Sequence, residues 1–364
     1  MRTIRGIGFI LERRAEPSWL LALLSPLIAI ALTMVTGAIV FAALGLNPLH
    51  ALFVFFIAPL TTGSLERLAL TAAPLVLIAC GLCLCFRARV WNIGAEGQFI
   101  MGAIAGSLFP VFLTGWQSSL VTVLMLALGI IGGMTWAAIP AFLKSRFGAS
   151  EILTSVLLVY VAQRLLDWLL SGPWRDPQSS GIAKSVSFAG GQLLPTFGGT
   201  LHLVVAFAVA AAVALAFLLA NGMKGYEIKV SGLAPKAARF AGFSRSGLVW
   251  FTFLLSGGLS GLAGISELMT TVKQLQPVIA ASSGFTAIIV AFLGRLNPLG
   301  AMIAGLVIAV THVGGETAGA ALGISPKVSQ VFQGILLLCI LGCDALVHHR
   351  VALSGLPRLR LRIG

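Results

Sequence analysis

The sequence predicts an all-α protein that crosses a membrane about ten times. Of its 364 residues, 58% are hydrophobic and only 10% are charged, which leaves too little polar surface to cover a soluble globule. Apolar windows of about 17–25 residues, the length of a membrane-spanning helix, also recur along the whole chain. These observations exclude a water-soluble globular protein.

The apolar windows divide the chain into ten expected spans. They cover residues 19–44, 68–86, 97–115, 121–143, 151–170, 201–219, 247–268, 280–294, 298–314 and 328–346. The first window is far longer than the core of a cleaved signal peptide, about 7–15 residues, so we expect an uncleaved anchor. We expect one transmembrane domain over 1–364, with a short N-terminal segment 1–18, loops at 171–200 and 221–247, and a basic C-terminal segment 347–364.

The distribution of charge assigns the sides of the membrane. An even number of spans places both termini on one side, where eighteen of the 24 lysines and arginines also fall; five fall on the other side, and Arg164 lies within a span. Positive residues in short loops stay in the cytoplasm, so both termini and the 221–247 loop are expected to be cytoplasmic and the 171–200 loop external. This rule accounts for the net charge of +13. Binding of nucleic acid does not account for it, since the lysines and arginines form no stripe with interleaved aromatic residues.

A polar stretch interrupts the apolar pattern over residues 86–102. Asn92, Glu96 and Gln98 lie in it, among glycines, directly after the arginine-flanked end of the second expected span. Irregular backbone at membrane depth is tolerated only where protein or a water-filled cavity surrounds it. The stretch therefore predicts a helix break that faces a pathway. In a second interpretation, Glu96 caps or braces Arg89 and holds the break in shape.

A similar interruption follows in the last third of the chain. The apolar run 282–295 ends in an arginine and is followed by Asn297, Pro298 and another apolar run. Both interruptions share the order apolar run, arginine, asparagine, glycine, apolar run, which predicts a degenerate internal repeat. Paired breaks in corresponding halves indicate a site between the repeats. The candidate substrate-pathway residues are Asn92, Glu96, Gln98 and Asn297.

The internal loop 221–247 contains a predicted two-turn amphipathic helix. Pro235 suits its first position and Gly242 can end it. Its faces separate apolar from basic residues, with Ala237, Phe240 and Ala241 on one side and Lys236 and Arg239 on another. Such a helix on the cytoplasmic face can lie on anionic lipid or fill a groove in another protein.

Three further segments have two interpretations each. Residues 47–60 are apolar but too short to cross the membrane comfortably, which fits an external re-entrant or interfacial helix. Arg164 and Asp167 are three residues apart and share one helix face. They form either a structural ion pair near the outer membrane surface or a direct contact with the substrate. The loop 171–200 is a docking surface for an external protein or a plain connector.

The sequence contains no arrangement of catalytic residues. It lacks the Gly-x-x-x-x-Gly-Lys-Ser/Thr loop that cradles nucleotide phosphates, the His-Glu-x-x-His zinc motif and the Gly-x-Ser-x-Gly elbow. Cys80, Cys83 and Cys85 have no histidine partners at metal-ligand spacing, so we expect no metal site. We therefore do not expect an enzyme.

Asn-Ile-Gly-Ala-Glu-Gly-Gln at 92–98 resembles the signature of the ABC transporter permeases of the branched-chain amino acid, ribose and nucleoside superfamily. The pattern at 284–300 and the loop GYEIKVSGLAPKAARFAG at 225–242 are similar to the same permeases. The branch most similar to this chain is the simple-sugar and nucleoside branch, which works with basic-membrane-protein-type binding lipoproteins. Here Leu-Ala-Pro stands where the family often has Asn-Pro, which weakens the helix cap by about 1 kcal/mol.

The resemblance implies the permease subunit of an ATP-driven importer that moves a nucleoside or simple sugar across the bacterial inner membrane. It implies no cofactor in this chain, because a partner ATPase subunit binds ATP and magnesium. A second permease subunit, identical or different, and an external substrate-binding protein would complete the transporter. The residues expected to grip the ATPase are Pro235, Lys236, Ala237, Arg239 and Phe240. The alternative is a secondary carrier driven by an ion gradient, for which Glu96 and Glu267 are the candidate ion-binding carboxylates.

Overall fold

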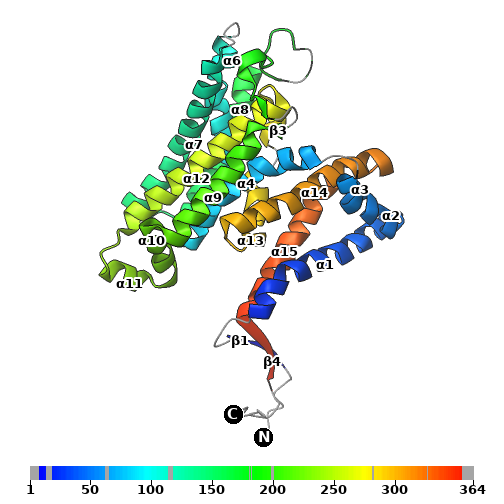
Figure 1. The fold of residues 1–364 in the computed structure, drawn as a ribbon, viewed down its shortest axis with the longest axis vertical. Helices are drawn as coiled ribbons and strands as arrows, with labels where there is room; N and C mark the ends of the chain where they lie inside the picture. Colours follow the sequence, from blue (N-terminus) through cyan, green and yellow to red (C-terminus); the bar gives the residue numbers. More distant parts are fainter. Residues whose placement is uncertain are drawn as a thin grey trace. The chain divides into compact units, whose positions relative to one another are not determined.

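The computed structural model describes residues 8–13, 19–61, 65–113, 118–179, 181, 183–197, 201–280, 283–325 and 327–354. Most of these residues are helical, as the sequence predicts (Figure 1). The chain forms two compact units: a smaller one of Met1–Leu52 and Gln330–Gly364, and a larger one of Phe53–Ser329. Of the expected terminal segments, residues 1–7, 14–18 and 355–364 lie outside the described part of the chain.

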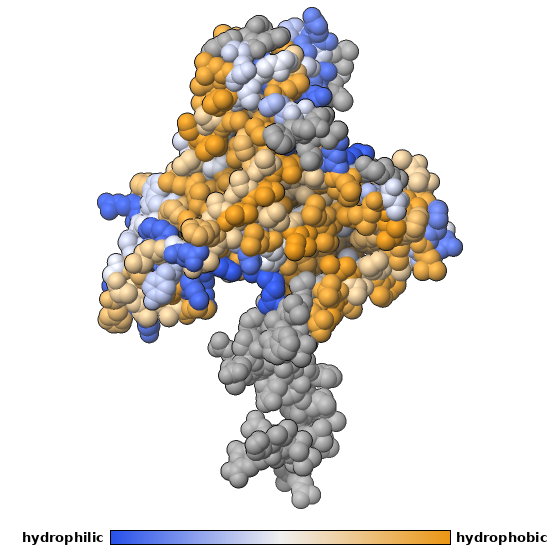
Figure 2. All heavy atoms as spheres, viewed as in Figure 1, coloured by the Kyte–Doolittle hydropathy of each residue, from blue (hydrophilic) through white to orange (hydrophobic). Residues whose placement is uncertain are grey.

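The larger unit is a helical bundle with the long helix α12 at its centre. Its main helices are α4 (Leu65–Arg87), α5 (Ala95–Gly106), α6 (Leu108–Phe112), α7 (Ser119–Phe147), α8 (Glu151–Ser171), α9 (Leu203–Asn221), α10 (Met223–Leu233), α11 (Pro235–Phe240), α12 (Arg245–Glu267), α13 (Ser283–Leu293) and α14 (Pro298–Leu322). Helix α12 packs against α7, α5 and α4, and α14 packs against α4 and α9. On the face in Figure 2, hydrophobic residues cover the middle of this bundle and hydrophilic residues gather at its two ends, as a membrane requires.

Seven helices in the described part of the chain are long and apolar enough to cross a membrane. They are Leu65–Arg87, Ala95–Phe112, Ser119–Phe147, Glu151–Ser171, Leu203–Asn221, Arg245–Val272 and Pro298–Leu322. The predicted count of about ten is therefore not confirmed. The expected span 280–294 contains α13, and 11 residues of helix cover only about 16 Å of a hydrocarbon core about 30 Å thick.

Glycines allow α7 and α12 to approach each other closely. A β-carbon on Gly261 would overlap the carbonyl oxygen of Gly129, and one on Gly133 would overlap that of Gly257. Lipid provides no hydrophobic drive between helices, so such close backbone contact is a main source of packing energy in a membrane. These glycines therefore contribute to the packing of α7 against α12.

The described residues of the loop 171–200 pack against the end of α12. Helix α12 continues as the π-helix η3 (Leu268–Val272), and the loop contains η2 (Gly190–Gln192), β2 (Thr196–Phe197) and β3 (Leu201–His202). Three backbone N–H groups of the loop donate to carbonyls at or just after η3: Ser185 to Leu275 at 2.9 Å, Phe188 to Lys273 at 2.7 Å, and Leu194 to Met269 at 3.2 Å. Phe188 and Leu194 are buried. These contacts test neither interpretation of the loop, so docking surface and plain connector both stay predictions.

Two further predictions near the spans have different outcomes. Arg164 and Asp167 form the expected ion pair on α8, with 3.2 Å between Nη1 and Oδ2, on an exposed face. The segment after Asn47 is helical as α2 (Pro48–Leu52), η1 (Phe53–Ile57) and α3 (Ala58–Thr61). Whether it re-enters the membrane stays a prediction.

The smaller unit contains a strand pair that the all-α prediction did not include. Helices α1 (Trp19–Ala43) and α15 (Val328–His348) meet through the rings of Phe41 and Phe332, whose centroids are 5.3 Å apart. Strand β1 (Gly8–Arg13) pairs antiparallel with β4 (His349–Ser354), with Gly8 opposite Ser354. This pairing holds residues 8–13 and 349–354 side by side. The cytoplasmic location of the termini stays a prediction.

Candidate functional site

The first predicted break lies between α4 and α5. Helix α4 ends at Arg87, and its end is closed by a hydrogen bond of 2.9 Å from the Val90 N–H to the Cys85 carbonyl. Arg89 takes a left-handed backbone conformation with φ of 53°, which ends the helix because a residue with a side chain rarely continues one there. The chain then runs without helix to Ala95, where α5 begins.

The side-chain amides of Asn92 and Gln98 form hydrogen bonds with each other inside the protein. The Asn92 amide donates to Gln98 Oε1 at 3.0 Å, and the Gln98 amide donates back to Asn92 Oδ1 at 3.1 Å. The Asn92 amide also donates to Ser256 Oγ on α12 at 3.1 Å. All three side chains are buried. Asn92, Gln98 and Ser256 form one group, which we call the Asn92 cluster.

The break is also fastened to α8. The Ile93 N–H donates to Ser155 Oγ at 3.3 Å, and the Gly94 N–H donates to Asn92 Oδ1 at 3.1 Å. A β-carbon on Gly94 would stand 2.7 Å from the Ser155 carbonyl oxygen, so only glycine allows this approach. Backbone groups that leave a helix must find partners in the protein. In this break, the hydroxyl of Ser155 on α8 and the side chain of Asn92 provide them.

Glu96 connects the break to the second half of the chain. Its buried carboxylate accepts a hydrogen bond from the Gly284 N–H, in the first turn of α13. A carboxylate at a helix N-terminus is stabilised by the free N–H groups and the helix dipole. A β-carbon on Gly284 would overlap the backbone of Glu96. The predicted brace on Arg89 stays a prediction, whereas the contact with α13 was not indicated by the sequence.

The second break repeats the hydrogen bonding of the first. The turn around Arg295, with φ of 55°, matches the turn around Arg89. In both turns the arginine N–H donates to the carbonyl three residues earlier, and the next N–H donates to the carbonyl five residues before its own position. The four bonds are Arg89 to Phe86 at 3.1 Å, Arg295 to Phe292 at 2.9 Å, Val90 to Cys85 at 2.9 Å and Leu296 to Ala291 at 2.8 Å.

Equivalent phenylalanines of the two breaks meet. Phe86 and Phe292 each lie three residues before the arginine, and their rings stack with centroids 5.3 Å apart and planes 22° from parallel. Equivalent residues contact one another when a local two-fold axis passes between them. The matched turns and this stack support the predicted internal repeat around the two breaks.

Asn297 lies apart from the other three predicted pathway residues. It is exposed, and its Oδ1 accepts a hydrogen bond from the Leu299 N–H at 3.2 Å, which makes it the N-cap of α14. Asn92, Glu96 and Gln98 are buried together at the first break. The structure therefore joins three of the four predicted residues. The sequence analysis did not identify Ser155, Ser256 and Gly284, because single serines and glycines are common in membrane spans.

The predicted short helix in the internal loop is present as α11. Pro235 stands in its first turn, and its N-cap residue Ala234 makes no side-chain bond. Helix α11 turns Ala238 inward, whereas Ala237 and Phe240 are exposed, Phe240 to 93%. Figure 1 shows α10 and α11 at one end of the bundle and α6 at the other. The apolar side of α11 is therefore uncovered in this chain.

Helix α10 links α11 to the first break. A β-carbon on Gly232, near the end of α10, would overlap the carbonyl oxygen of Arg87 at the end of α4. The backbones of the internal loop and of the break are thus in direct contact. A displacement of α10 must move the end of α4 or open a gap beside it.

The sequence matches the family described as "Branched-chain amino acid transport system / permease component" over residues 64–341. The chain belongs to this permease family. The matched residues include both breaks and the whole internal loop. The predicted resemblance is thereby confirmed.

Named relatives of this permease agree with that assignment. A glucose ABC transporter permease of Haloferax volcanii is 33% identical over 355 residues, which cover 94% of this chain and 93% of the relative. A nucleoside ABC transporter permease of Lactococcus lactis is 27% identical, covering 87% and 90%. A guanosine ABC transporter permease of Bacillus subtilis is 26% identical, covering 87% and 92%. The chain is thus a multi-pass membrane subunit of an ABC transporter.

The permease shows no metal-binding group in its described residues, where no set of three His, Cys, Asp or Glu side chains comes together. Its described cysteines are free thiols, and Cys80, Cys83 and Cys85 are buried within α4. A buried free cysteine packs as a small apolar side chain.

Proposed function

We propose that the permease is the transmembrane subunit of an ATP-driven importer for a simple sugar or a nucleoside. The similarity over 94% of the chain to a glucose permease, together with the two nucleoside-type relatives, supports this substrate class. A partner ATPase subunit binds ATP and magnesium, because the sequence of this chain contains no nucleotide-binding loop. An external binding protein delivers the solute, and the termini and the internal loop face the cytoplasm.

In this proposal, the ATPase moves the permease through α11. Phe240 is the apolar residue that enters the ATPase surface, and Pro235, Lys236, Ala237 and Arg239 surround it on the same short helix. Displacement of α11 passes through α10 to the end of α4, where Gly232 touches Arg87. A ligand or nucleotide can drive such a change only by binding one conformation more tightly than the other.

The proposed pathway residues take part only after the break rearranges. In the described conformation the amides of Asn92 and Gln98 bond to one another and to Ser256. If α10 separates α4 from α12, these amides become free to bind sugar or base hydroxyl and amide groups. A second permease subunit, identical or different, would form the other wall of the pathway.

Reconstituted transport tests the proposal. Vesicles that contain the permease, its ATPase and its binding protein should take up labelled sugar or nucleoside only with ATP and magnesium. Vesicles that contain the permease alone should take up neither under a proton or sodium gradient. Gradient-driven uptake by the permease alone would contradict the proposal and favour a secondary carrier. The solute that co-purifies with the binding protein would identify the substrate.

Assembly with the ATPase should depend on Phe240. We expect Phe240→Asp to abolish co-purification of the ATPase, because a carboxylate would have to be buried in an apolar contact. Membrane insertion should be unchanged, since Phe240 is 93% exposed. Gln178→Asp is the control, because it introduces the same charge at an exposed position outside the seven helices that can cross a membrane. ATPase binding that survives Phe240→Asp would contradict the role of α11.

A further inference from the structure

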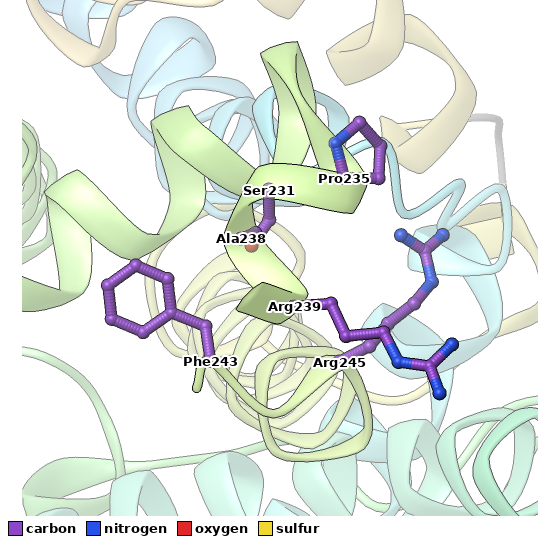
Figure 3. Close-up of a pocket in the computed structure, with 6 residues that line it drawn as sticks. All are labelled: Ser231, Pro235, Ala238, Arg239, Phe243 and Arg245. Atoms are coloured by element: carbon purple, nitrogen blue, oxygen red, sulfur yellow. The ribbon is translucent and has the colours of Figure 1, made fainter. Parts of the chain in front are cut away.

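A recess opens beside α11 on the internal loop. Its volume is about 390 Å³, and its walls come from three helices and the turn between α11 and α12: Ser231, Pro235, Ala238, Arg239, Phe243 and Arg245 (Figure 3). Ser231 and Ala238 form a buried floor, and the two arginines are exposed at its edge. The recess has the size of a site for one side chain or one small group.

Arg239 and Arg245 point to the same side of the recess (Figure 3). Among the described residues, neither arginine forms an ion pair with an acidic side chain. Two guanidinium groups that share one opening repel each other and create a positive potential there. Planar guanidinium groups bind carboxylates through two parallel hydrogen bonds. The charge and the geometry both favour an anion in this recess.

The internal loop contains no spare acid to neutralise this pair. Residues 221–247 contain five basic side chains and one acidic side chain, Glu227. Glu227 is already bonded to Lys224, with 2.7 Å between Nζ and Oε2. The anion must therefore come from outside this loop.

Exposed apolar residues beside the recess favour a protein partner. Phe240 is 93% exposed and Leu233, at the end of α10, is 72% exposed. An apolar centre with a charged rim is the usual arrangement of a protein interface. The recess is continuous with the proposed ATPase contact on α11, so the same partner would cover both.

We propose that the recess receives an aspartate or glutamate side chain of the ATPase subunit, held between Arg239 and Arg245. This inference rests on the proposed function, and it adds a charged contact to the apolar contact of Phe240. The carboxylate would enter with the hydroxyl of Ser231 at the floor. An anionic lipid headgroup is the competing occupant, and the experiment separates the two.

Carbodiimide cross-linking tests the contact in the assembled transporter. Carbodiimide joins an amine to a carboxylate only when the two touch, and it does not act on arginine. The variants Arg239→Lys and Arg245→Lys keep the positive charge and add an amine at the recess. We expect each variant to form a new amide link to an Asp or Glu of the ATPase, identified by mass spectrometry. Arg175→Lys, an exposed position in the external loop, is the control and should form no link to the ATPase.

Charge reversal provides a second measurement. The double variant Arg239→Glu and Arg245→Glu should weaken ATPase binding by about tenfold or more, because it places like charges in contact. Lys229→Glu, a single exposed charge reversal on α10, should weaken ATPase binding less than either Arg239→Glu or Arg245→Glu alone. Native mass spectrometry of the same samples should show no difference in bound anionic phospholipid.

The outcomes separate this inference from the proposed function. If the ATPase binds but neither substituted position forms a link, and the double reversal binds as tightly as the unmodified permease, the arginine recess is not the contact. If the double reversal loses phospholipid and keeps its ATPase affinity, the recess binds lipid and the inference is wrong. If the unmodified permease binds no ATPase, the proposed function itself fails.

Discussion

Replacement of Asn92 tests whether the break is held by its own side chains. Asn92→Leu keeps a side chain of similar size but removes the two amide bonds with Gln98, the bond with Ser256 and the acceptor of the Gly94 N–H. Gln98, Ser256 and Gly94 remain buried without a replacement for these bonds. Each buried polar group that loses its partner costs about 1–3 kcal/mol, so the two bonds of the Gln98 amide alone predict a loss of about 2–6 kcal/mol.

The double variant should recover much of this loss. When both members of a buried polar pair become apolar, no unsatisfied group remains between them, and the change can be nearly neutral. Asn92→Leu with Gln98→Leu should therefore unfold at a higher denaturant concentration than either single variant. The coupling free energy from this cycle should be about 2 kcal/mol or more.

Unfolding in mixed detergent micelles, followed by tryptophan fluorescence, measures these free energies. Gln178→Leu is the control, because Gln178 is an exposed amide in the external loop and should change stability by no more than about 0.5 kcal/mol. If the losses of unfolding free energy in the two single variants simply add in the double variant, the two amides do not stabilise each other and the reasoning fails.

Transport by the stable double variant answers a separate question. Recovered uptake would assign the two amides to structure, and lost uptake would assign them to the pathway.

Two glycine substitutions test the contacts between helices. Gly232→Ala should keep ATPase binding but reduce ATP-driven uptake, because its methyl group pushes α10 away from Arg87. Gly247→Ala is the control, because the nearest atom to its new methyl group is 3.5 Å away. Equal uptake by both variants would contradict the proposed transmission of movement from α10 to α4. Gly261→Ala should lower the midpoint temperature of thermal unfolding in detergent, because its methyl group overlaps α7 at a cost of about 1–3 kcal/mol. Gly334→Ala is the control, because no atom lies within 4 Å of its new methyl group, and it should leave the midpoint unchanged. An unchanged midpoint for Gly261→Ala would show that the helices can separate without cost.

The sequence identified the elements of the site correctly where the signal was local. The short internal helix at 235–240 followed from proline, alternating apolar and basic residues and a closing glycine, and the structure contains it. The break before Ala95 followed from polar residues inside an apolar region. Both signals lie within a few residues of the feature that they predict.

The sequence failed where the answer depends on contacts between distant residues. Ser256 lies 164 positions from Asn92, and Gly284 lies 188 positions from Glu96. Hydropathy also suggested a full span at 280–294, because an apolar run does not reveal where its helix begins. The strand pair between β1 and β4 joins opposite ends of the chain and has no local signal.

The sequence by itself therefore determined that the chain is a membrane protein and where its helices break. These properties depend on the transfer of each residue from water to lipid and on backbone preferences, which are local. Only the tertiary structure decided that the polar residues of the break bond to α8, α12 and α13. A buried polar group needs a partner of complementary geometry, and packing of distant helices, not the order of residues, selects that partner.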